Sequence, residues 1–171
     1  IVNIMTETVD CLLNALGTRD YDSIESIWEK LDKQDIDKSL PDLLNVIATG
    51  RDIYVREQIS ILLGDMGIEM LVPIVFDIVN SSPPDVSIST FLYSIRNLDY
   101  RLYFKDLISI SINRGEGARE EALDLVCSKH EWFTSDKQIR YVQECIRACR
   151  DRELMDIADD LECLLELLRS R

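Results

Sequence analysis

The fold of this chain is indicated most clearly by residues 40–67, which read LPDLLNVIATGRDIYVREQISILLGDMG. Apolar residues recur in this stretch at intervals of three and four positions, the spacing that places them on one face of an α-helix. Gly50 and Asp52 interrupt the pattern, and Gly67 closes it. Glycine is typical of the residue after a helix, and aspartate is typical of the N-cap before one. The stretch therefore predicts two amphipathic helices joined by a short turn.

The same pattern recurs along the chain with a period of about 31 residues. The first helices carry an apolar pair in register at Leu12-Leu13, Leu43-Leu44, Val75-Phe76, Leu107-Ile108 and Tyr141-Val142. In the second helices, three series of residues recur in register. The first is Ile24, Val55, Val86 and Ala118, and the second is Trp28, Ile59, Thr90 and Ala122. The third is Leu31, Leu62, Tyr93 and Leu125. A period of this length corresponds to one helical hairpin per unit. Each hairpin can bury its apolar faces only against its neighbours.

We expect ten helices within a single domain that spans residues 1–171. A chain of 171 residues suits one domain with a sizeable core and is short for two. Only 6 glycines and 4 prolines are present, which disfavours an all-β fold with many tight turns. The expected helices are 2–16, 21–32, 39–49, 53–66, 69–80, 84–98, 101–113, 117–129, 135–149 and 152–169.

Residues 40–67 resemble a HEAT repeat. The resemblance is carried by Leu40-Pro41 early in the first helix, Asp52 in the turn, Val55-Arg56 at the start of the second helix and Leu63-Gly64 near its end. Residues 115–122 resemble the same second-helix opening, whereas Ile24-Glu25 and Val86-Ser87 depart from it. The resemblance implies an all-α, right-handed α-α superhelix of about five HEAT-like hairpins, whose second helices line a concave surface. It implies a binding scaffold and not a particular reaction.

The charge of the chain restricts the partners that it can bind. It carries 32 acidic against 19 basic residues, a net charge of −13. Phosphate groups bind most strongly to clustered cations. The excess of acids over bases therefore disfavours binding to duplex DNA or to an anionic membrane. The sequence also has no apolar run that approaches the roughly 20 residues of a membrane span. We therefore expect a protein partner, most simply a basic one, with no direct nucleic-acid or membrane contact.

Five cysteines are scattered along the chain, at positions 11, 127, 145, 149 and 163. An odd, dispersed set is a poor disulfide framework and favours reduced thiols in the cytoplasm. Cys145 and Cys149 lie one helical turn apart, and Cys163 faces them if the last two helices pair. Three thiolates could bind zinc, but the short Cys-x-x-Cys knuckle is absent. Packing in the core is the favoured interpretation, and we expect no metal ion.

The sequence offers little for catalysis. The only histidine, His130, follows Cys127 by three positions, which is the spacing of surface neighbours at a helix end as much as that of a catalytic dyad. Gly64 and Gly67 end a helix, whereas a phosphate-binding loop needs glycines before one. We therefore expect a protein that is not an enzyme and that holds no cofactor.

Acidic residues recur on the side of the second helices that points away from the predicted core. The expected partner-binding residues are Glu29, Glu57, Glu120 and Asp124, with Ile88 and Phe91 as an apolar centre among them. An apolar spot within a polar rim is typical of a protein interface. The alternative is an ordinary solvated face, with Ile88 and Phe91 in the core if the register of this helix differs.

Trp132 and Phe133 lie in a predicted loop and form a second candidate. Aromatic side chains in a loop can anchor a partner. The alternative, which we favour, is that they cover the core or staple the loop to the following helix.

These patterns predict a non-enzymatic protein-binding module. The more specific hypothesis is an acidic immunity or inhibitor protein that neutralises a basic toxin, such as a nuclease, through its concave face. Small acidic immunity proteins of bacterial toxin systems are similar in size and charge. The alternative is a chaperone or assembly adaptor. A HEAT-like DNA glycosylase or lyase is a third option, but the glycosylase requires a basic concave face that the sequence does not predict.

Overall fold

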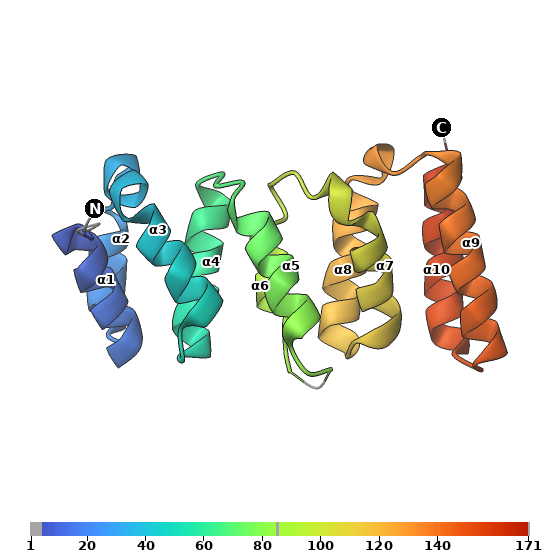
Figure 1. Ribbon diagram of the computed structural model, residues 1–171, viewed down its shortest axis with the longest axis horizontal. Coiled ribbons are helices and arrows are strands. Elements are labelled where there is room, and N and C mark those ends of the chain that lie inside the picture. Colours follow the sequence, from blue (N-terminus) through green and yellow to red (C-terminus); the bar gives the residue numbers. More distant parts are fainter. Residues whose placement is uncertain (1–4, 85, 171) are drawn as a thin grey trace.

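The computed structural model describes residues 5–84 and 86–170. Over these residues the chain is helical throughout, with ten α-helices and two 3₁₀ turns (Figure 1). The elements are α1 (Glu7–Thr18), α2 (Tyr21–Trp28), α3 (Lys33–Thr49), α4 (Ile53–Asp65), α5 (Leu71–Ser81), α6 (Ser89–Ser94), η1 (Arg101–Tyr103), α7 (Phe104–Asn113), α8 (Glu116–Ser128), η2 (His130–Trp132), α9 (Asp136–Asp151) and α10 (Met155–Arg169).

The helices lie in consecutive pairs, one after another along the longest axis of the molecule (Figure 1). From the second pair on, the odd-numbered helices form one layer, in which α3 contacts α5 and α7 contacts α9. The even-numbered helices form the other layer, in which α6 packs between α4 and α8, and α8 contacts α10. The apolar core lies between these layers, as expected for amphipathic helices that bury one face each.

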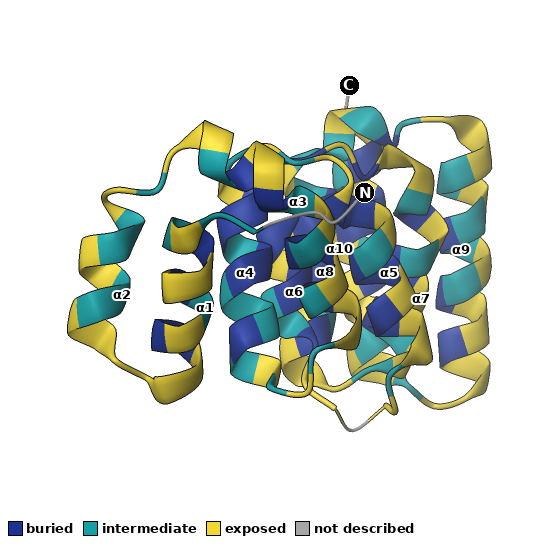
Figure 2. Cartoon of the chain, turned by 60° about the vertical axis from the view of Figure 1, so that its left-hand side comes forward, coloured by how far each residue is buried: buried dark blue, intermediate teal, exposed yellow. Residues whose placement is uncertain are grey.

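The first pair departs from this regular order. Helix α1 contacts both α3 and α4, and α2 packs on α1 at the edge of the molecule (Figure 2). No residue of α2 is fully buried, although Ile24, Ile27 and Trp28 pack partly against the core. Helix α2 therefore does not continue the layer of α4, α6 and α8 as the repeat pattern predicts.

The helix ends of the second pair follow the sequence closely. Gly50 is the C-cap of α3, and Gly67 adopts a left-handed backbone with φ 75° just after α4. The Asp52 side chain accepts a hydrogen bond from the backbone N–H of Val55 and caps α4. One boundary was wrong, because α3 begins at Lys33 and not near residue 39, and therefore contains Pro41. The Asp32 side chain caps this earlier start.

Arg56 gives a physical reason for arginine in the quoted motif. Its Nε–H donates to the backbone carbonyl of Ile47 at 2.6 Å, and its guanidinium lies 5.4 Å from the centre of the Phe91 ring. The last carbonyls of a helix have no partner within the helix. Arg56 therefore satisfies the end of α3 and joins it to α4 and α6. Arg114 does the same for α5, because it donates to the carbonyls of Val79 and Pro83.

The third pair has a different register from the one predicted. Val86 is 40% exposed and Tyr93 is 41% exposed, whereas Ile88, Leu92 and Ile95 are buried. The buried column therefore lies two residues later than the sequence pattern indicated. The cause is the connection after α5, which continues past Pro84, so that α6 starts only at Ser89 and not near residue 84.

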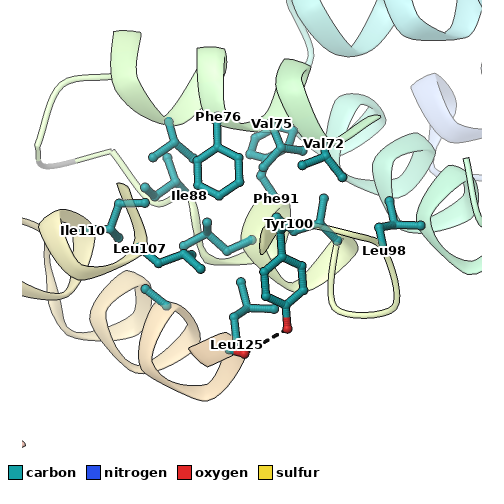
Figure 3. Packing of buried hydrophobic residues seen from close by; sticks show 14 of the residues in the cluster. Val72, Val75, Phe76, Ile88, Phe91, Leu98, Tyr100, Leu107, Ile110 and Leu125 are labelled. Atoms are coloured by element: carbon teal, nitrogen blue, oxygen red, sulfur yellow. Dashed lines mark hydrogen bonds between the residues drawn. The ribbon is translucent and has the colours of Figure 1, made fainter. Parts of the chain in front are cut away.

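The centre of the core lies where α5, α6, α7 and α8 meet (Figure 3). Phe76 of α5 stacks on Tyr103 with the ring centres 4.1 Å apart. The buried Tyr100 hydroxyl donates to the carbonyl of Leu125 at 2.8 Å, which satisfies a polar group inside the core (Figure 3). Phe133 is fully buried beside Phe104, so it covers the core as the favoured interpretation proposed.

Helices α4 and α6 approach each other closely at Gly64 of α4. A Cβ atom added there would lie 1.8 Å from the carbonyl oxygen of Ser94 at the end of α6. A backbone carbonyl cannot move aside as a flexible side chain can. Alanine at this position therefore requires α4 and α6 to separate.

We expect Gly64→Ala to lower the free energy of unfolding by about 1–3 kcal/mol or more, because overpacking a close backbone contact is costly. Thermal or denaturant unfolding of the purified chain measures this. Gly17→Ala is the matched control, since Gly17 lies in α1 with nothing within 4 Å of an added Cβ. That control should stabilise the chain by about 0.5–1 kcal/mol. Equal effects of the two substitutions would contradict the packing described here.

Candidate functional site

The histidine considered for catalysis contacts the backbone of its candidate partner, Cys127. The Nδ1 atom of His130 lies 3.1 Å from the backbone carbonyl oxygen of Cys127, and its hydrogen bond is to this oxygen. All five cysteines are free thiols. Burial raises the pKa of Cys127, Cys145 and Cys149, which favours the protonated thiol over the nucleophilic thiolate.

Among residues 5–84 and 86–170, no group of three or more His, Cys, Asp or Glu side chains is placed to hold a metal ion. In the described part of the chain, no helix combines the length and the apolar character that crossing a membrane requires.

The predicted partner-binding residues do not form one surface. Glu120 and Asp124 are exposed on α8, and Glu57 is half-buried on α4. Glu29 is exposed at the end of α2, the edge helix, so the predicted row of acids is interrupted between α2 and α4.

The prediction that Ile88 and Phe91 form an exposed apolar centre is wrong, because both side chains are fully buried. The shifted start of α6 turns them into the core, where they pack with residues of α5 and α7 (Figure 3). They are therefore not an exposed apolar centre. Tyr93, which the sequence pattern placed in the core, is the exposed aromatic residue of this helix.

A hollow of about 500 Å³ lies on the even-helix layer between α6 and α8. We call it the α6–α8 hollow. It is lined by Tyr93, Arg96, Glu121, Asp124, Leu125, Cys127 and Ser128. Of the residues predicted from sequence, only Asp124 lines it. An interior position was predicted for Tyr93. The half-buried positions of Arg96 and Glu121 depend on the true register of α6 and on its packing against α8.

The cation in this hollow is already held in place. Arg96 forms an ion pair with Asp65 of α4 at 2.7 Å, and its guanidinium lies 3.9 Å from the centre of the Tyr93 ring. These contacts fix both side chains and join α4 to α6. The carboxylates of the hollow are left facing solvent beside a fixed aromatic ring.

Two acids on this layer, Glu121 and Glu57, are partly desolvated. Burial raises the pKa of Glu121, the neighbouring Asp124 raises it further, and Arg96 opposes the shift. Burial also raises the pKa of Glu57, whereas Thr90 of α6 and Arg56 lower it. A carboxylate with a raised pKa lacks sufficient positive charge or hydrogen-bond donors around it. Such a group gains from a cation that a partner brings.

Comparison with known proteins does not identify a family for this chain. No protein family, curated protein or solved structure matches the chain. The candidate site therefore depends on the geometry and charge described above.

We expect Glu57→Gln to raise the melting temperature slightly at neutral pH. The folded-state pKa of Glu57 is raised, so the stability that its protonated form contributes is lost as pH increases through that pKa. Glutamine is neutral at every pH and keeps the shape of the side chain. The difference from the unmodified chain should vanish below the ordinary carboxyl pKa. Melting curves across this range measure it, with exposed Glu29→Gln as the control. A stabilisation that persists in acid would contradict the assignment.

Proposed function

We propose that this chain is a non-enzymatic protein-binding scaffold that docks a basic protein on its even-helix layer. We also propose that it is one domain with a HEAT-like, right-handed superhelical arrangement of helical hairpins. The consecutive pairs and the two layers support this arrangement. The five free cysteines fit a reducing compartment, the cytoplasm.

The observation that carries the docking proposal is the pair Glu121 and Asp124 in the α6–α8 hollow. Asp124 disfavours ionisation of Glu121, and Glu121 is partly buried as well. An arginine from a partner can offer several N–H donors to carboxylates and can stack on an aromatic ring such as Tyr93. The hollow supplies both features within one concavity.

The more specific proposal is an immunity or inhibitor protein for a basic toxin, such as a nuclease. Its support is the net charge of −13 and the acidic hollow. Opposite charges accelerate the association of two proteins, which suits rapid neutralisation of a toxin. The alternative is a chaperone or assembly adaptor. An immunity protein should have one tight partner, and an adaptor should have several weak ones.

We expect reversal of Glu121 and Asp124 to lysine to weaken binding of the basic partner by about tenfold or more, mainly through slower association. The partner is first identified by affinity purification at low salt and mass spectrometry. Its association rate and affinity are then measured with the purified proteins over a series of salt concentrations. The reversed chain should also show a weaker dependence on salt.

The matched control reverses Asp77 and Asp151, two exposed acids of the odd-numbered helices α5 and α9. It changes the net charge by the same amount on the other layer. Equal losses in the two variants would show that only overall charge matters. An unchanged affinity in the Glu121 and Asp124 variant, or a partner with no cationic surface, would refute the proposed docking site.

A further inference from the structure

A second groove lies on the odd-helix layer, where η1 and the start of α7 meet the start of α9. It has a volume of about 600 Å³. We call it the α7–α9 groove. It is lined by Arg101, Leu102, Phe104, Lys105, Lys137, Gln138, Arg140, Tyr141 and Glu144.

The charge of this groove is opposite to that of the whole chain. Four of its lining residues are cations and one is an acid, although the chain carries 32 acids and 19 bases. Two of the cations have partners nearby, because Arg101 pairs with Asp99 and the Nε–H of Arg140 donates to the carbonyl of Asp136.

Lys105 and Lys137 differ from these two cations. Both are exposed, and no described residue forms an ion pair with either of them. The ammonium group of Lys105 lies 5.2 Å from the centre of the Tyr141 ring, so the aromatic ring holds it at the groove without neutralising it. Because both ammonium groups line the same groove, together they can attract an anionic group.

The groove also has an apolar wall. Leu102 is 93% exposed, the most exposed of the large apolar side chains in the described chain. Removing an exposed leucine from water is favourable, so a partner that covers Leu102 gains affinity. The exposed side of Tyr141 adds aromatic surface beside it.

We propose that the α7–α9 groove binds an acidic protein segment that carries a large apolar side chain. The carboxylates of the segment pair with Lys105 and Lys137. Its apolar side chain packs on Leu102 and Tyr141. Such a segment contacts the cations and the exposed leucine together. An inorganic anion or a phosphate can contact only the cations.

A nucleic acid fits the groove less well. Its phosphates extend well beyond the cations and would meet the acidic surroundings, which include Glu144, Asp106 and Asp136. Charges interact over about 8 Å at physiological salt. A long polyanion extends past the groove and comes within this range of other parts of a chain with net charge −13, which repel it. A short segment with a few carboxylates stays within the groove, where four cations and one acid line the wall.

This site is independent of the proposed function. The α6–α8 hollow takes a basic partner on the even-helix layer, and the α7–α9 groove takes an acidic segment on the odd-helix layer. The two surfaces belong to different helices and carry opposite charge. One chain can therefore hold two partners of opposite charge at once.

The test is selection of peptides from a phage-displayed random library on the immobilised full chain, with counter-selection on the Lys105→Glu, Lys137→Glu variant. We expect the selected peptides to combine Asp or Glu with Leu, Phe or Trp. A selected peptide, labelled with fluorescein, is then titrated by fluorescence anisotropy. Affinity should decrease about tenfold or more in the double variant and several-fold in Leu102→Ser.

The control variant is Lys33→Glu, Lys38→Glu on α3, which makes the same charge change at two exposed lysines away from the groove. It should bind the peptide as the unmodified chain does, and circular dichroism checks that all variants fold. The proposal is overturned if no groove-dependent peptide is enriched, if basic peptides are enriched, or if the control loses as much affinity. It is also overturned if labelled oligothymidine binds the groove more tightly than the acidic peptides. A dimer in sedimentation experiments that the double variant abolishes would assign the groove to a second copy instead.

Discussion

The packing of α4 against α6 is the contact on which the rest of the structure depends. The two backbones approach so closely that only glycine fits at position 64, opposite the carbonyl of Ser94. Because α6 also packs against α8, this contact joins the two ends of the chain in one apolar core. It also sets the register in which Asp65 pairs with Arg96. The acidic hollow on the even-numbered helices is therefore a consequence of how tightly α4 and α6 pack.

The two layers of the molecule each carry a concavity, and the two concavities are opposite in charge. On the even-numbered helices, Glu121 and Asp124 lie beside an arginine that is already paired. On the odd-numbered helices, Lys105 and Lys137 have no acidic partner among the described residues and lie beside an exposed leucine. A net charge of −13 describes neither surface alone. Local charge and apolar exposure decide which partner each surface fits.

Sequence reasoning predicted the helices better than the surfaces. The number of helices and the turn between α3 and α4 agree with the structure over the described residues, because Gly50, Asp52 and Gly67 act within a few residues of the chain. The predicted register of the third pair was wrong by two residues, since the connection between α5 and α6 is longer than the repeat pattern allows. This error alone moved Tyr93 from the expected core to the hollow. The α7–α9 groove was missed because its cations are far apart in sequence.

By itself, the sequence determined that the chain is helical and where most of its helices end, because apolar spacing and end-capping residues act locally. It also determined the excess of acids over bases. Only the tertiary structure decided that Ile88 is buried and Val86 is exposed, because neighbouring helices select the face that a short helix turns inward. Packing likewise brought Lys105 and Lys137 to one groove, since the distance between charges on different helices is set by how the helices meet.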